Sequence, residues 1–182
     1  MARVAKNDPL AIGPVLDRGA LGVVVPMVET ADEAQAAVES ARYGPAGRRS
    51  IGGGFMRDWL PFDDSEANDE IFVAIQIETA LGVQNAAEIM RVDGVDGCWI
   101  GPWDLALSMG VDMESPALRE AIRTTIAACK QAGKVPGIAT PGPQNEWLEA
   151  GCLFVTVGSD VSCVHQGGVQ TLDQFRRYRP RS

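Results

Sequence analysis

The sequence predicts a parallel α/β fold that forms a single domain over residues 1–182. Short apolar segments rich in valine and isoleucine alternate with segments of helical periodicity. Glycine and proline separate the two kinds of segment, and no linker or low-complexity tract interrupts the alternation. Repeated β–α units imply a parallel sheet with right-handed crossovers, and two closures satisfy that pattern, a doubly wound sheet and a (β/α)8 barrel.

The strands and helices follow one another in a simple order. Residues 1–20 have the pattern of a strand end, a loop and a helix. Five further segments have the pattern of buried parallel strands, and they are residues 21–28, 71–78, 94–101, 134–140 and 152–160. Helices are predicted over residues 30–43, about 80–91, 115–133 and 141–151, with a last one that runs toward residues 175–178.

Two of the predicted helices begin with recognisable capping residues. Thr30 followed three residues later by Glu33 is a capping box. Ser115 followed by Pro116 is a typical N-cap and first helical position.

The chain is short for a closed barrel. A (β/α)8 barrel takes about 250 residues, whereas this chain has 182. It therefore lacks two to three β–α units, and we expect it to start in the middle of its architecture.

Composition excludes several classes of protein. The hydrophobic share of 46% and the charged share of 22% are those of a globular protein, and the net charge of -8 argues against binding to nucleic acid or to an anionic membrane. No apolar run is long enough for a membrane span and the N-terminus lacks the apolar region of a signal peptide, so we expect a cytoplasmic location. The four widely spaced cysteines contain no C-x-x-C pair and are expected to be reduced thiols, and they are Cys98, Cys129, Cys152 and Cys163.

Two carboxylates follow neighbouring predicted strands. Glu78 ends the strand 71–78, and Asp104 follows the strand 94–101 after a Gly-Pro turn. In a parallel α/β protein both lie at the C-terminal edge of the sheet, where active sites gather. Side-chain alternation puts Gln76 on the same strand face as Glu78. A divalent metal site is one interpretation; the other makes Glu78 a favourable charge at a helix N-terminus and Asp104 an N-cap.

Other residues that carry chemistry have weaker support. His165, the single histidine, falls in the last predicted helix and is interpreted as solvent-facing. The glycine-rich segment 44–54 lacks the spacing of a nucleotide-binding loop and is interpreted as a surface loop. Trp103, next to Asp104, is the tryptophan closest to the expected site.

Four ordered motifs resemble the HpcH/HpaI aldolase family. They are "VPMVETADEA", "RYGPAGRRSIGGG", "QIET" and "IGPWDLALSMG", and the resemblance extends from "RVAKNDP" to "FVTVGSD". The family comprises class II, metal-dependent 2-oxo-acid aldolases with a (β/α)8 barrel. The resemblance therefore implies a partial barrel with about five β–α units.

The resemblance also implies roles for individual residues. Glu78 and Asp104 match the metal ligands, with Mg²⁺ or Mn²⁺ as the expected ion and Co²⁺ as a further candidate. Gln76 matches the glutamine beside the bound 2-oxo acid, and the backbone N–H groups of Trp103 and Asp104 match those that hold its carboxylate. Arg3 matches an arginine that approaches the substrate oxygens.

The chain departs from the family pattern at its N-terminus. The family's first two strands carry a "D-x-E-H" motif whose histidine assists proton transfer, and nothing in residues 1–182 matches it. Position 103 is more often a small or amide residue in the family, so Trp103 is expected to reshape the pocket.

The leading functional hypothesis is reversible aldol cleavage of 2-oxo-4-hydroxy acids, with pyruvate as the enolate component and an aldehyde as its partner. Two alternatives remain open at this stage. One is a citrate-lyase-β-like lyase acting on acyl-CoA substrates, and the other is a truncated, non-catalytic barrel. Because a partial barrel exposes sheet edges and an apolar interior, we expect a homo-oligomer.

Overall fold

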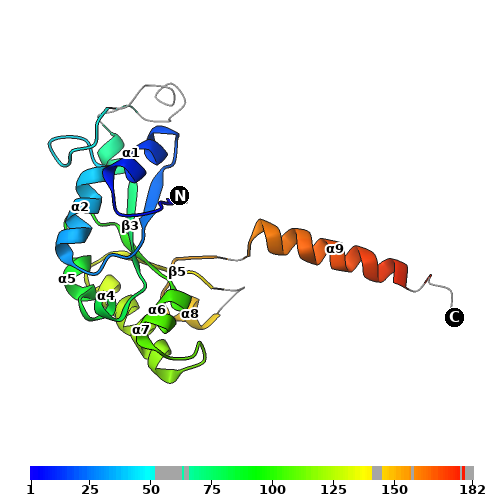
Figure 1. Ribbon diagram of the computed structural model, residues 1–182. Coiled ribbons are helices and arrows are strands. Elements are labelled where there is room, and N and C mark those ends of the chain that lie inside the picture. The colour runs from blue at the N-terminus through cyan, green and yellow to red at the C-terminus, as the bar shows by residue number, and fades with distance from the viewer. Residues whose placement is uncertain (52–62, 64–65, 141–144, 157, 177, 179–182) are drawn as a thin grey trace.

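A curved, six-stranded parallel sheet forms the centre of the protein (Figure 1). The computed structural model describes residues 1–51, 63, 66–140, 145–156, 158–176 and 178. The strands are β1 (Ala2–Arg3), β2 (Gly22–Val25), β3 (Phe72–Ile77), β4 (Gly97–Ile100), β5 (Val135–Ile138) and β6 (Phe154–Val155). Each strand pairs with the strands next to it in the sequence. A doubly wound sheet would reverse its order at a switch point, so this sheet follows the barrel order, and the predicted partial barrel is confirmed.

Helices follow the strands as predicted, with one further short helix over residues 67–70 that the sequence analysis did not predict. They are α1 (Pro9–Asp17), α2 (Ala31–Ala41), α3 (Ala67–Glu70), α4 (Ala80–Gln84), α5 (Ala86–Met90), α6 (Pro102–Met109), α7 (Pro116–Gln131), α8 (Asn145–Ala150) and α9 (Asp160–Arg176). The capping box of α2 is confirmed, since the Thr30 hydroxyl accepts a hydrogen bond from the Glu33 N–H at 3.2 Å and the Glu33 carboxylate accepts one from the Thr30 N–H at 3.1 Å. Ser115 caps α7 as expected.

Several boundaries differ from the prediction. The N-terminal strand end is β1, which brings the number of described strands to six rather than five. The predicted helix over residues 80–91 is two short helices, α4 and α5, that meet at Asn85. The side chain of Asn85 donates a hydrogen bond to the Glu29 carbonyl at 2.8 Å, a tertiary contact that accompanies this break. The segment 152–160 contains only the two-residue strand β6.

Two predictions lie partly outside the described residues. The predicted helix 141–151 is described from Asn145, where α8 begins. The glycine-rich segment 44–54 is described as far as residue 51.

The outer face of the sheet packs under the helices and forms the core. Alternate side chains of strands β2 to β5 are fully buried there, and the group includes Val23, Val25, Val73, Ile75, Ile77, Cys98, Ile100 and Ile138. The prediction that the isoleucine and valine side of β3 packs under helices is therefore confirmed.

The opposite, inner face carries a small aromatic group. Phe154 stacks on Trp99 with ring centroids 4.9 Å apart, and it meets Phe72 edge-on at 5.9 Å. Gly137 lies beside Phe154 in the next strand, and a Cβ atom at Gly137 would collide with the Phe154 ring. The inner face is therefore filled locally by aromatic rings that need a glycine beside them.

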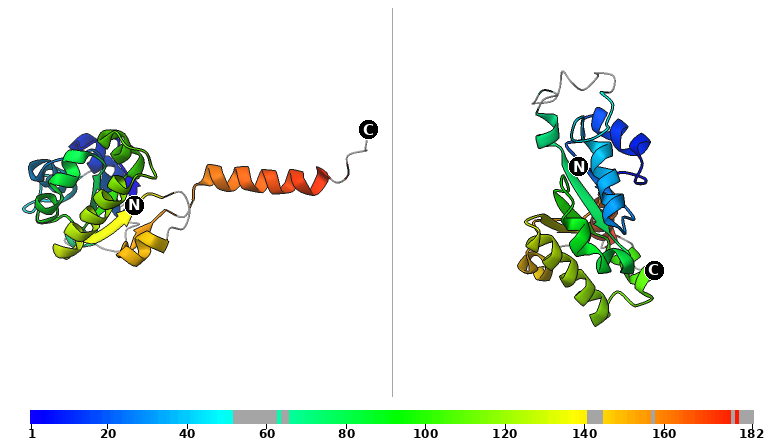
Figure 2. Two further views of the ribbon diagram at one scale, coloured as in Figure 1. Left: turned by 90° about the horizontal axis from the view of Figure 1, so that it is seen from below. Right: turned by 90° about the vertical axis from the view of Figure 1, so that its left-hand side faces the viewer.

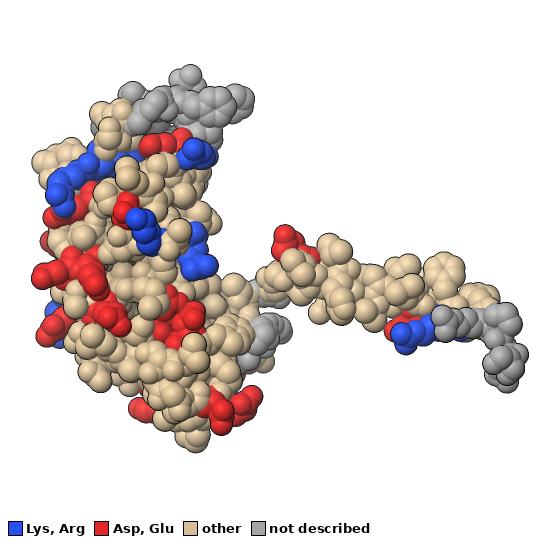
Figure 3. Space-filling model, viewed as in Figure 1, with Lys and Arg blue, Asp and Glu red and all other residues tan. Residues whose placement is uncertain are grey.

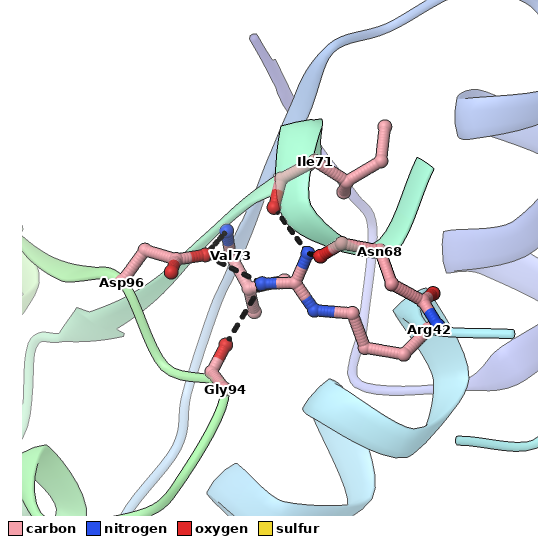
Figure 4. A network of polar contacts seen from close by, with 6 residues as sticks. All are labelled: Arg42, Asn68, Ile71, Val73, Gly94 and Asp96. Atoms are coloured by element: carbon pink, nitrogen blue, oxygen red, sulfur yellow. Dashed lines mark hydrogen bonds and ion pairs between the residues drawn. The ribbon is translucent and has the colours of Figure 1, made fainter. Parts of the chain in front are cut away.

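A buried arginine links strands β3 and β4 near their N-terminal ends (Figure 4). Arg42, just after α2, donates hydrogen bonds to the carbonyls of Asn68 and Ile71, and to the Gly94 carbonyl at 3.2 Å. It also forms an ion pair of 2.8 Å with Asp96, which accepts a further hydrogen bond from the Val73 N–H at 2.7 Å. This network stabilises the edge of the sheet opposite the one that bears the carboxylates.

Helix α9 extends away from the rest of the molecule (Figures 1 and 2). None of its described residues is buried. Among the described residues, no helix is both long and apolar enough to cross a bilayer.

Candidate metal centre

The two predicted carboxylates lie at the C-terminal edge of the sheet, as expected. Glu78 directly follows β3, and Thr79 after it caps α4 by accepting a hydrogen bond from the Gly82 N–H at 3.0 Å. Asp104 lies in the first turn of α6, whose N-cap is Gly101. The interpretation of Asp104 as an N-cap is therefore wrong, because the helix begins two residues earlier, at Pro102.

Glu78 is held in place by groups from two strands. Its side chain is buried, with an exposed fraction of 3%. One carboxylate oxygen accepts a hydrogen bond from the Met27 N–H at 2.9 Å, and the other accepts one from the side-chain amide of Gln76. Met27 follows β2 and has a positive φ of 56°, a conformation that non-glycine residues adopt rarely and that concentrates at functional sites.

Burial and a neighbouring acid weaken the ionisation of Glu78. Desolvation raises the pKa of Glu78 above its ordinary value of 4.5, and the charge and hydrogen bond of Asp104 raise it further. The N–H groups of Met27 and Gln76 oppose this rise in pKa. Asp104 is exposed, whereas Glu78 is buried. Two carboxylates that interact in this way are stabilised when a cation lies between them.

Gln76 presents an oxygen without a partner. Its side chain has an exposed fraction of 6%, and among the described atoms its Oε1 has no hydrogen-bond partner. Buried polar atoms are normally paired, so an unpaired one at this position is available to a ligand.

Gly101 keeps the centre open. A Cβ atom at this position would lie 2.8 Å from Glu78 Oε2 and 3.0 Å from Gln76 Nε2. Glycine therefore leaves space beside the carboxylate and the amide, where an ion or a substrate oxygen could bind.

The start of α6 provides backbone donors. Pro102 is the first helical residue and has no N–H group, so Trp103 and Asp104 carry the first N–H groups of the helix. Such groups lack partners inside their helix and favour anions. Trp103 is 48% exposed.

Arg3 lies on the inner face of the sheet. It is in register with Val24 of β2, which is in register with Ala74 of β3. Gln76 follows Ala74 by two residues on the same face. Measured along the strand direction, Gln76 is therefore about 7 Å beyond the level of Arg3, Val24 and Ala74. The flexible Arg3 side chain therefore starts on the face that leads to Gln76 and Glu78.

The structure leaves other candidate residues outside this centre. His165 is exposed on α9, as the sequence predicted. The thiols of Cys98, Cys129 and Cys152 are buried together on the helical side of the sheet. Within the described ranges, no three His, Cys, Asp or Glu side chains come together as a metal cluster. The sequence did not reveal the Met27 N–H contact, and only the "PMVE" turn after β2 could have pointed to it.

Fold and site together define a class of protein, the (β/α)8-barrel enzymes with an acidic centre at the C-terminal ends of their strands. The chain belongs to the HpcH/HpaI aldolase/citrate lyase family, whose profile matches residues 1–166.

Individual relatives agree with this assignment. The chain is 43% identical to a 4-hydroxy-2-oxo-heptane-1,7-dioate aldolase from Salmonella arizonae, over 96% of this chain and 70% of that protein. The crystal structure of an HpcH/HpaI aldolase/citrate lyase family protein from Burkholderia cenocepacia superimposes with a TM-score of 0.85 at 33% identity, covering 96% of this chain and 72% of that one.

A more distant structure shares the fold alone. It is the citrate lyase beta subunit from M. tuberculosis, solved with oxaloacetate and magnesium. Its TM-score is 0.55 at 18% identity, with 85% of this chain and 66% of that chain covered.

Proposed function

We propose that this chain catalyses the reversible aldol cleavage of 2-oxo-4-hydroxy acids, with pyruvate as the enolate component. The observation that carries the proposal is the centre formed by Glu78, Asp104 and Gln76 in a chain of this family. The aldolase name of the Salmonella arizonae relative supports the reaction class.

The residues present fit a divalent metal ion. The carboxylates of Glu78 and Asp104 are hard oxygen ligands, and Gly101 leaves space beside Glu78. The unpaired oxygen of Gln76 next to them is available to the substrate. Carboxylate donors suit Mg²⁺ or Mn²⁺, with Co²⁺ as a further candidate, and Glu78 and Asp104 would hold the ion. When bound, the metal supplies Lewis-acid stabilisation of the charge that develops on the 2-oxo oxygen.

The chain's own residues bind and orient the substrate. The N–H groups of Trp103 and Asp104 at the start of α6 bind the carboxylate of the 2-oxo acid. Arg3, on the inner face of the sheet, adds positive charge near the 2-oxo oxygen as it becomes negative.

The proposed reaction breaks the bond between C3 and C4 of the substrate. The C4 hydroxyl loses its proton to a base and C4 becomes the carbonyl carbon of the released aldehyde. The electron pair of the broken bond stays with C3 as an enolate, which takes up a proton at C3 and leaves as pyruvate. His165 does not serve as the base, since it lies on the extended helix α9.

A metal-titrated assay of pyruvate release tests the proposal. We expect Glu78→Gln and Asp104→Asn to lose both metal binding, measured by calorimetry, and pyruvate release. Glu120→Gln, on the exposed side of α7, is the matched control and should retain both. Unchanged turnover in the Glu78 and Asp104 variants would overturn the assignment. Acyl-CoA thioesters in the same assay test the citrate-lyase-like alternative, and cleavage of these substrates alone would replace the aldolase assignment.

We also propose that α9 joins two copies of this chain. Val161, Val164, Leu172 and Phe175 are spaced so that they share one face of the helix, and each is more than 60% exposed. This face carries no charge, and α9 is mostly uncharged in Figure 3. Copies with a net charge of -8 repel one another, so an uncharged apolar face is where they can associate.

Light scattering after gel filtration tests this association. Leu172→Asp should shift the protein toward the monomer, whereas Gln170→Asp on the polar side of α9 should not. A monomeric unaltered chain at micromolar concentration would contradict the proposal.

The four cysteines are all free thiols. Reduced thiols fit the cytoplasmic location that we propose.

A further inference from the structure

A cavity lies at the start of α6, the helix that carries Asp104. Its volume is about 340 Å³, and it lies between the start of α6, the first half of α7, the end of β5 and helix α8. Pro102 and Trp103, which directly precede Asp104, form part of its wall. The turn expected to bind the substrate carboxylate therefore also borders this cavity.

Most of the cavity wall is apolar. Trp103 and Trp147 provide two indole rings, and Met113, Leu118 and Ile122 provide aliphatic side chains. A volume near 340 Å³ is at the lower end of the range for small-molecule pockets, about 300–1,000 Å³. It suits one aromatic ring or a short alkyl chain.

The charges at the cavity disfavour a carboxylate ligand. Arg119 is the single cation among the described lining residues, and Glu146 already pairs with it at 2.5 Å. The other oxygen of Glu146 pairs with Arg123 at 2.6 Å. Glu114 lies at the same wall and adds a negative charge. An anionic group here would have to compete with Glu146 for Arg119, whereas an apolar group would only replace water.

We infer that this cavity, formed around Trp103, receives the tail of the acceptor aldehyde, and that the preferred tail is apolar, either aryl or short alkyl. This inference rests on the proposed aldolase function. The carboxylate end of the aldol binds at the backbone of Trp103 and Asp104, and the apolar end packs against the Trp103 ring and the wall formed by Met113 and Ile122. Trp103 thereby determines specificity through its side chain and binds substrate through its backbone.

The first experiment compares acceptor aldehydes with pyruvate as the donor. Benzaldehyde and butanal are tested against succinic semialdehyde, which carries a carboxylate, in the metal-loaded protein. We expect kcat/KM to favour the apolar aldehydes by roughly tenfold or more, because their tails bury apolar surface in the cavity. A preference for succinic semialdehyde would overturn the inference.

A substitution that fills the cavity tests whether the preference for apolar aldehydes arises from the cavity wall. Met113→Trp should reduce the preference for benzaldehyde over succinic semialdehyde by roughly tenfold, since the larger ring occupies the space of the tail. Leu107→Trp is the matched control, because Leu107 is 82% exposed on α6 and does not line the cavity. An unchanged preference in Met113→Trp would show that the tail binds elsewhere.

A binding measurement separates failure of the inference from failure of the proposed function. Benzyl alcohol does not react, so its binding can be followed in the metal-free protein by the NMR shift of the Trp103 indole N–H, assigned with Trp103→Phe. If no aldehyde is converted but benzyl alcohol shifts this resonance in the unaltered chain and not in Met113→Trp, the aldolase function fails and the apolar cavity stands. If aldol addition proceeds and benzyl alcohol shifts nothing, the function stands and the inference fails.

Discussion

At the scale of single residues, Glu78 has an unfavourable charge in the metal-free protein. Its raised pKa means that the folded chain holds this proton more tightly than the unfolded chain. The stability that the protonated group contributes is complete below its ordinary pKa of 4.5 and is lost as the pH rises through the folded pKa.

We therefore predict that the metal-free protein loses stability as the pH rises above about 4.5, and that Glu78→Gln reduces this loss. Urea unfolding with a chelator present, at several pH values between 4 and 8, measures the effect. Glu120→Gln serves as the control and should follow the unaltered chain. A Glu78→Gln profile parallel to that of the unaltered chain would contradict the raised pKa.

The cysteines provide a second prediction at this scale. Burial raises the pKa of the Cys152 thiol to about 11. The pKa of Cys98 is also raised, first by its hydrogen bond with Cys129 and then by burial. Cys163 is exposed on α9. Iodoacetamide at neutral pH should therefore modify Cys163 rapidly and Cys98 and Cys152 slowly, as mass spectrometry of digested protein can show. Rapid modification of Cys152 in the folded protein would contradict its burial.

The sequence predicted the positions of individual residues correctly where the local sequence pattern alone determines them. Glu78 and Asp104 are at the expected sheet edge because each follows a strand that periodicity makes clear. The hydrogen bond from Met27 to Glu78 joins residues 51 positions apart. Neither periodicity nor spacing encodes such a contact, because it depends on the pairing of β2 with β3 and on an unusual backbone conformation at Met27.

At the scale of elements, Arg42 connects α2 to the starts of β3 and β4. Removal of its side chain leaves buried carbonyls and the Asp96 carboxylate without their partner (Figure 4). We predict that Arg42→Ala lowers the free energy of unfolding by about 3–5 kcal/mol.

Arg48→Ala is a matched control for this prediction. Arg48 pairs with Glu39, but its side chain is 79% exposed. Its loss should cost less than about 1 kcal/mol. Urea denaturation measures both variants, and similar losses of stability would show that the Arg42 network contributes no more than a surface ion pair.

Helix boundaries show where sequence reasoning is sufficient and where it is not. The start of α2 was predictable from Thr30 and Glu33, because a capping box is local. The break at Asn85 was not, because it coincides with a contact to Glu29 that exists only after β2 and β3 have paired. The two-residue length of β6 likewise depends on its pairing with β5.

At the scale of the whole molecule, the inner face of the sheet accommodates its aromatic group because Gly137 has no side chain where the Phe154 ring lies. We predict that Gly137→Ala destabilises the protein by about 1–3 kcal/mol, because the added methyl group collides with the ring.

Gly167→Ala provides the comparison. A Cβ atom at Gly167 meets nothing within 4 Å, and alanine favours a helix over glycine by up to about 1 kcal/mol. Thermal unfolding should therefore show a lower midpoint for Gly137→Ala and an unchanged or higher one for Gly167→Ala. Equal midpoints would mean that the sheet relaxes without cost.

The partial barrel was predictable as a whole because strand order, chain length and motif order all pointed to it. Its inner aromatic group was not, since Phe72, Trp99 and Phe154 come together only through the register of β3 to β6.

The sequential order of the strands also bears on how the chain folds. Every strand pairs with the one made just before it, so each pairing closes only the segment between two neighbouring strands, from 17 residues between Gly137 and Phe154 to 50 between Gly22 and Phe72. Separations of this size make the pairing of parallel strands slow. A sheet of this order can grow from its N-terminal edge while the rest of the chain is still being synthesised, with each new unit added to a surface already in place.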